Sequence, residues 1–100
     1  MIVYNVTVKV ELIINDVWVD WMKKDHCPKI LATGCFTDYR MFRVMEEDQS
    51  DGMTYAVQFY AESLSDYFTF QNEHYRSLQA EMKDLFQEKC LSFRTVLREV

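Results

Sequence analysis

The stretch of sequence that decides the fold is residues 2–12, IVYNVTVKVEL. Apolar side chains stand at every second position, and polar side chains fill most of the positions between them. Because successive side chains of an extended chain point to opposite faces, this alternation predicts a strand with one buried face. That face consists of Ile2, Tyr4, Val6, Val8, Val10 and Leu12.

A helix is predicted next, over residues 17–25, where large apolar side chains recur at helical spacing. Pro28 has no backbone N–H and cannot continue a helix, so we expect a break or kink just before it. Residues 29–33 can form one further turn, which Gly34 closes with a left-handed backbone. The apolar stripe of this first helix is formed by Trp18, Trp21 and Met22.

The rest of the chain predicts two more strands, a long helix and a last strand. An acidic stretch, Glu46–Asp51, is followed by Gly52 and predicts a hairpin turn between the middle strands. The long helix contains no Gly or Pro, although a bend near His74 is left open. The predicted elements are strands at 36–46 and 53–61, a helix at 64–85 and a strand at 90–100.

The resulting order is strand–helix–strand–strand–helix–strand. With right-handed crossovers, this order gives the ferredoxin-like βαββαβ plan of the α+β class, a four-stranded antiparallel sheet with two helices on one face. A chain of 100 residues that is 49% apolar has room for one core, so we expect residues 1–100 to form a single domain.

The sheet face away from the helices is expected to be bulky and to carry Tyr39, Met41 and Tyr60. Leaving apolar area in water costs about 25 cal/mol per Å². A second copy packing sheet to sheet would cover it, so we predict a homodimer whose two sheets close into a barrel.

Charge and composition exclude several classes. The net charge of −5 opposes nucleic-acid binding, which needs a clustered positive field. Apolar runs are too short for a membrane span. The spacing of His and Cys fits neither a metal site nor a disulfide framework, and no cofactor is expected. The odd set of three cysteines, Cys27, Cys35 and Cys90, is typical of free thiols in the cytoplasm.

The segment 18–36, WVDWMKKDHCPKILATGCF, resembles a small bacterial family of unknown function whose members read W-x-x-W-M-x-x-x-H-I-P-x-x-L-x-T-G-x-F. Residues 1–7 and 93–97 are also similar to that family, while Cys27 departs from its pattern. The family resembles the dimeric α/β-barrel group, which includes cofactor-free monooxygenases, muconolactone-isomerase-like enzymes and haem proteins. The resemblance implies the fold, the dimer and small-molecule binding between helices and sheet, but no particular activity.

His26 is the candidate catalytic residue, because it stands where the first helix is expected to end. A histidine at the mouth of a pocket can act as a general acid or base. The alternative is structural, since the ring can also cap the last helix carbonyls and interact with the helix dipole.

The candidate ligand-binding residues are aromatic or cationic. An aromatic pocket would hold a planar ligand, although aromatic stripes also simply fill cores. Arg40 shares a predicted strand face with Phe36, where its guanidinium could bind a carboxylate; the alternative is a salt bridge. The full set is Trp18, Trp21, Phe36, Arg40, Tyr4 and Tyr55.

Two functions remain open at this point. In the first, the homodimer binds a small anionic or aromatic molecule between helix one and the sheet, and an enzyme like a cofactor-free monooxygenase or isomerase is one form of it. In the second, the dimer is a non-enzymatic interaction module without a ligand pocket. A cavity reached by His26 favours the first function.

Overall fold

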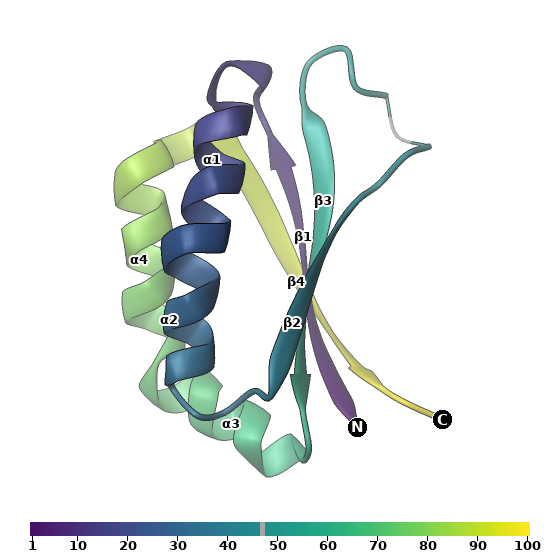
Figure 1. Cartoon of the computed structure of the whole chain (residues 1–100), viewed down its shortest axis with the longest axis vertical. Helices are drawn as coiled ribbons and strands as arrows, with labels where there is room; N and C mark the ends of the chain where they lie inside the picture. The colour runs from purple at the N-terminus through teal and green to yellow at the C-terminus, as the bar shows by residue number, and fades with distance from the viewer. Residues whose placement is uncertain (47) are drawn as a thin grey trace.

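The computed structural model describes residues 1–46 and 48–100. Its four strands form one sheet in the order β2-β3-β1-β4, and every neighbouring pair is antiparallel (Figure 1). The predicted α+β class and four-stranded antiparallel sheet are confirmed. The strands are β1 (Ile2–Val10), β2 (Asp38–Arg43), β3 (Met53–Ala61) and β4 (Cys90–Arg98).

The helices lie together on one side of the sheet (Figure 1). The alternation of β1 is the predicted one, with Val8 and Val10 fully buried against the helix layer. Leu12 is an exception, because it leaves the strand for the 3-10 turn Leu12–Ile14 and is exposed. The core therefore lies between the sheet and the helices.

The first helical run does not break before Pro28. α1 (Asn15–Trp21) continues through a π-helical turn (Met22–His26) into α2 (Cys27–Ala32). The π turn takes up the local change in hydrogen bonding, and Pro28 falls in the first turn of α2, where a missing N–H costs little. Gly34 follows with φ +80°, as predicted for the end of the run.

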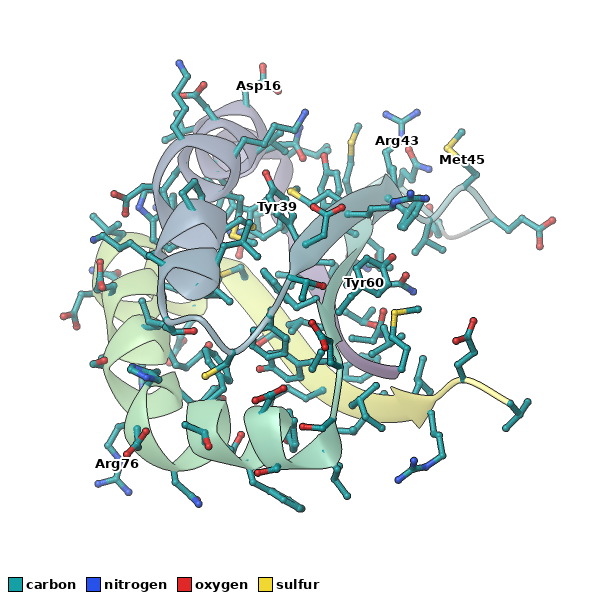
Figure 2. All side chains as sticks on the ribbon, turned by 60° about the horizontal axis from the view of Figure 1, so that its bottom comes forward. Asp16, Tyr39, Arg43, Met45, Tyr60 and Arg76 are labelled. Carbon is teal, nitrogen blue, oxygen red and sulfur yellow. The ribbon has the colours of Figure 1, made fainter. Side chains whose placement is uncertain are left out.

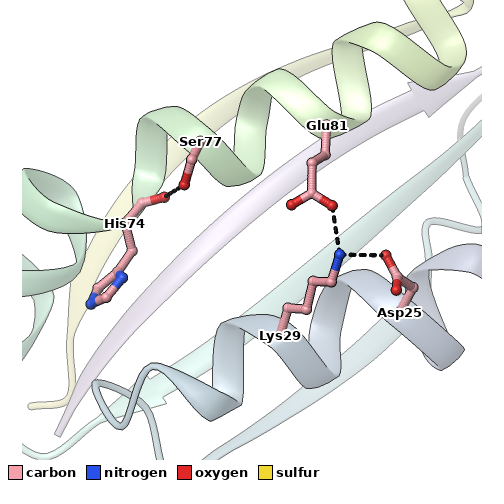
Figure 3. Close-up of polar contacts among 5 residues, drawn as sticks. All are labelled: Asp25, Lys29, His74, Ser77 and Glu81. Carbon is pink, nitrogen blue, oxygen red and sulfur yellow. Dashed lines mark hydrogen bonds and ion pairs between the residues drawn. The ribbon is translucent and has the colours of Figure 1, made fainter.

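The long second helix is divided at His74 into α3 (Leu64–Glu73) and α4 (Tyr75–Phe86). His74 has φ −124°, which interrupts the helical backbone. Its carbonyl oxygen accepts a hydrogen bond from the Ser77 hydroxyl at 3.2 Å at the start of α4 (Figure 3). The bend left open by the sequence is thus present.

The predicted faces of β2 are wrong. Tyr39 pairs with Phe59 and faces the helices, as does Met41, whereas Arg40 pairs with Gln58 on the open face. Figure 2 places Tyr39 and Tyr60 on opposite sides of the sheet. The error arises because Phe36 is buried in the loop before the strand and does not share its alternation.

The open face of the sheet, the face without helices, has a mixed surface. Tyr60 lies on it as predicted, and Phe42, Leu91, Phe93 and Leu97 add exposed apolar area. Polar side chains such as Asn5 and Gln58 lie among them. The predicted acidic hairpin Glu46–Asp51 falls partly outside the described residues, at position 47.

Candidate functional site

A small cavity lies between the helix layer and the sheet. Its walls come from the π turn, α2, α3 and α4 on one side and from β1, β3 and β4 on the other. Its volume is about 20 Å³, which is room for one water molecule. Most of its lining is apolar, and polar groups from His26, Tyr4 and Arg94 reach it.

His26 reaches this cavity from the π turn. Its side chain is only 5% exposed, and burial lowers the pKa of its imidazole to about 4. The neighbouring carboxylates of Glu81 and Asp25 oppose that shift. At neutral pH the ring is therefore uncharged, and no described residue hydrogen bonds to Nδ1. A buried polar atom left without a partner costs about 1–3 kcal/mol.

Tyr4 reaches the same cavity from the centre of the sheet. Its ring packs among Phe36, Phe59 and Phe70, with centroid separations of 5.8, 6.0 and 5.5 Å. Burial raises the pKa of the Tyr4 hydroxyl, and the charge of Arg94 opposes the shift. Tyr4 therefore stays protonated and can donate a hydrogen bond.

Arg94 enters the cavity wall from β4. The register pairs it with Val6, which places it on the helix side of the sheet. Its guanidinium donates a hydrogen bond to Gln71 Oε1 at 2.6 Å and lies 4.0 Å from the centroid of the Tyr75 ring. The strand position was visible in the sequence, but the approach of α3 and α4 to β4 was not.

Of the predicted site residues, the structure brings only His26 and Tyr4 to the cavity. Trp21 stacks on His26 and Phe36 stacks on Tyr4, but neither of them lines the cavity. Trp18 and Tyr55 form a separate pair with ring centroids 5.2 Å apart. The Tyr55 hydroxyl donates to Asn15 Oδ1 at 2.6 Å.

Arg40 lies apart from the other predicted residues. It is exposed on the open face of the sheet, so the predicted shared face with Phe36 is wrong. The cation that the sequence placed on β2 is supplied to the cavity wall by Arg94 of β4 instead.

A surface ion triad joins the π turn, α2 and α4. Lys29 Nζ lies 2.7 Å from Glu81 Oε1 and 3.4 Å from Asp25 Oδ2 (Figure 3). These partners raise the pKa of Lys29. The groups are partly exposed, so solvent screens the attraction between their charges. Through Lys29 and Glu81 the triad links α2 to α4 at the surface of the protein.

The thiol beside this site is unreactive. Cys27 is fully buried next to His26 in sequence, and burial raises its pKa to about 12. The thiolate form is therefore negligible at neutral pH. Within residues 1–46 and 48–100, no three His, Cys, Asp or Glu side chains converge in a way that could hold a metal ion. No helix in the same residues is long and apolar enough to cross a bilayer.

These features define an α+β protein in which a four-stranded antiparallel sheet and one layer of helices enclose a small cavity. The chain belongs, over residues 1–100, to the family described as Domain of unknown function (DUF4286). No curated protein matches it.

The fold is similar to the crystal structure of an ethyl tert-butyl ether d (EthD) family protein from Bacillus halodurans. The similarity covers 100% of both chains with a TM-score of 0.68 and 11% sequence identity. At that identity the likeness shows the fold alone.

Proposed function

We propose that this protein is a homodimer that binds a small organic molecule between its helix layer and its sheet, in contact with His26. The single observation that carries the proposal is the buried imidazole, whose Nδ1 has no hydrogen-bond partner among the described residues although it belongs to a residue that lines a cavity. A bound molecule would supply that partner. An interaction module without a pocket would gain nothing from this arrangement.

The pKa of His26 favours hydrogen bonding over proton transfer. Efficient general acids and bases have a pKa near the working pH. With a pKa of about 4, protonating His26 at pH 7 costs about 4 kcal/mol. His26 therefore acts in this proposal as a neutral group that orients the ligand, and the monooxygenase-like or isomerase-like chemistry is the less favoured form.

The second part of the proposal is a homodimer that forms through the open face of the sheet. A ferredoxin-like protomer leaves one sheet face open, and here that face exposes Phe93 by 66%, Phe42 by 47% and Leu97 by 43%. Packing two such faces against each other would remove these side chains from water and close the two sheets into a barrel. The helix-side cavity would remain accessible in each protomer.

A thermal-shift screen with a metabolite library tests the binding function. A ligand that binds only the native state raises the melting temperature. We expect at least one compound to stabilise the native protein and His74→Gln, but not His26→Gln. His74 is the matched control, because it is the second histidine and does not line the cavity. A library without any stabilising compound, or compounds that act equally on His26→Gln, would contradict the proposal.

A further inference from the structure

The cavity wall carries a single formal charge in a protein that is acidic as a whole. Among the described residues that line it, Arg94 is the charged one, because His26 is neutral at pH 7 and no Asp or Glu is present. The chain has a net charge of −5, yet no carboxylate is among the described residues that line this cavity. An anionic group is the complement of such a site.

The guanidinium of Arg94 is oriented but not neutralised. The Tyr75 ring lies 4.0 Å away and supports its face, while Gln71 accepts one hydrogen bond through a neutral amide oxygen. None of the ion pairs among the described residues includes Arg94. A guanidinium has five N–H donors in a planar fork, so two parallel donors suit a carboxylate.

We propose that the ligand of this cavity is a small organic acid whose carboxylate binds Arg94 and whose apolar body enters between the helix layer and the sheet toward His26. This inference rests on the proposed function and names its ligand class. Tyr4 lines the same cavity and is close enough to Arg94 to feel its charge, and its hydroxyl keeps the proton that it could donate to a ligand.

The room for the apolar body comes from flexible side chains. The enclosed volume of about 20 Å³ holds only a water molecule, so a ligand must displace side chains. Met22 and Met82 line the cavity on opposite helical runs. Methionine has three rotatable bonds and adapts to new shapes at low cost. Arg94 lies on the edge strand β4, which gives the carboxylate end access to solvent.

The test compares benzoate with benzamide, which has the same shape but no charge. Binding is followed by ¹H–¹⁵N NMR titration of the whole chain, with the imidazole of His26 as a reporter inside the cavity. We expect saturable shifts at His26 with benzoate and at least tenfold weaker binding of benzamide, because the amide forms no charge-assisted pair with a guanidinium.

Three variants assign the preference to Arg94. Arg94→Gln should bind benzoate and benzamide alike, and Arg94→Lys should retain part of the preference. Gln71→Glu should also weaken benzoate binding, because the new carboxylate would form an ion pair with Arg94 in place of the benzoate carboxylate. Arg98→Gln is the matched control, since it removes the same charge from the same face of β4 and does not line the cavity. Native NMR spectra of each variant confirm folding.

The outcomes separate the two proposals. Equal binding of both compounds with shifts at His26 would overturn the carboxylate inference and leave the binding function standing. An effect of Arg98→Gln equal to that of Arg94→Gln would also overturn it. Binding of neither compound would overturn the carboxylate inference, while the metabolite screen would still decide the binding function.

Discussion

The imidazole of His26 lies almost flat against the indole of Trp21, with ring centroids 4.7 Å apart and ring planes 26° apart. Phe86 meets the same indole edge to face at 5.2 Å. Trp21 covers one face of the imidazole and does not itself line the cavity. The stack contributes to the burial that keeps the imidazole neutral. The pKa of His26 and the pH dependence of the free energy of unfolding therefore depend on this stack.

The free energy of unfolding should fall as the pH is lowered from the ordinary pKa of His26, 6.5, toward its folded pKa of about 4. The pKa of His26 is about 4 in the folded chain and 6.5 in the unfolded chain. Between these two pH values the unfolded chain binds a proton at His26 and the folded chain does not. His26 then costs no stability above pH 6.5, and its cost grows as the pH falls from 6.5 toward 4. At pH 5 the loss is about 2 kcal/mol. Urea unfolding at pH 7.5 and pH 5.0 measures it.

The same measurement on His26→Gln isolates this residue from the other titrating groups. The free energy of unfolding at pH 7.5 minus that at pH 5.0 should be about 2 kcal/mol smaller in His26→Gln than in the native protein. In His74→Gln this difference should stay unchanged. An unchanged pH dependence in His26→Gln would show that His26 titrates normally in the folded protein.

Removing the stacked indole should return the pKa of His26 toward its ordinary value. In Trp21→Leu the imidazole gains access to water on its covered side, and desolvation is the largest cause of the lowered pKa. NMR titration of the His26 ring protons should show a midpoint that moves up from about 4. A midpoint that does not move would assign the burial of His26 to its other neighbours.

The open face should control the oligomeric state. Phe93→Glu places a charge where the two sheets are proposed to meet, and we expect it to convert the dimer into a monomer in sedimentation at micromolar concentration. Phe68→Glu is the control, because Phe68 is 50% exposed on α3, in the helix layer on the other side of the sheet. A native protein that sediments as a monomer would contradict the barrel.

The aromatic cluster around Tyr4 should carry much of the stability. Phe36 is buried with Tyr4, Phe59 and Phe70 as ring neighbours, so Phe36→Ala should cost about 3–5 kcal/mol in urea unfolding. The same truncation at exposed Phe68 should cost far less. Similar losses at both positions would mean that Phe36 is not part of a packed core.

The sequence predicted the strands in which buried and exposed side chains alternate regularly. Its predictions were wrong for the elements in which this alternation is interrupted. The alternation of residues 2–10 and 53–61 located β1 and β3, because both strands are central and most of one face of each is buried. The predicted phase of β2 is wrong because Phe36 is buried in the loop before the strand and does not follow the alternation of β2. The π turn was not predicted either, since Pro28 signals an irregularity but not its form.

The candidate site was predicted only in its local part. His26 could be chosen because it stands beside Pro28 at the end of a predicted helix. Arg94 could not be preferred over Arg40, because the choice depends on the register of β4 with β1 and on how α3 and α4 cross β4. Both are properties of the packed molecule and leave no local pattern.

The most direct test of the cavity as a ligand site is a crystal structure of the protein soaked in benzoate. We expect electron density for the benzoate ring between the helix layer and the sheet, in contact with His26, and for its carboxylate on Arg94. A cavity that holds only water, with Met22 and Met82 in the positions seen here and benzoate absent or bound elsewhere, would contradict this expectation.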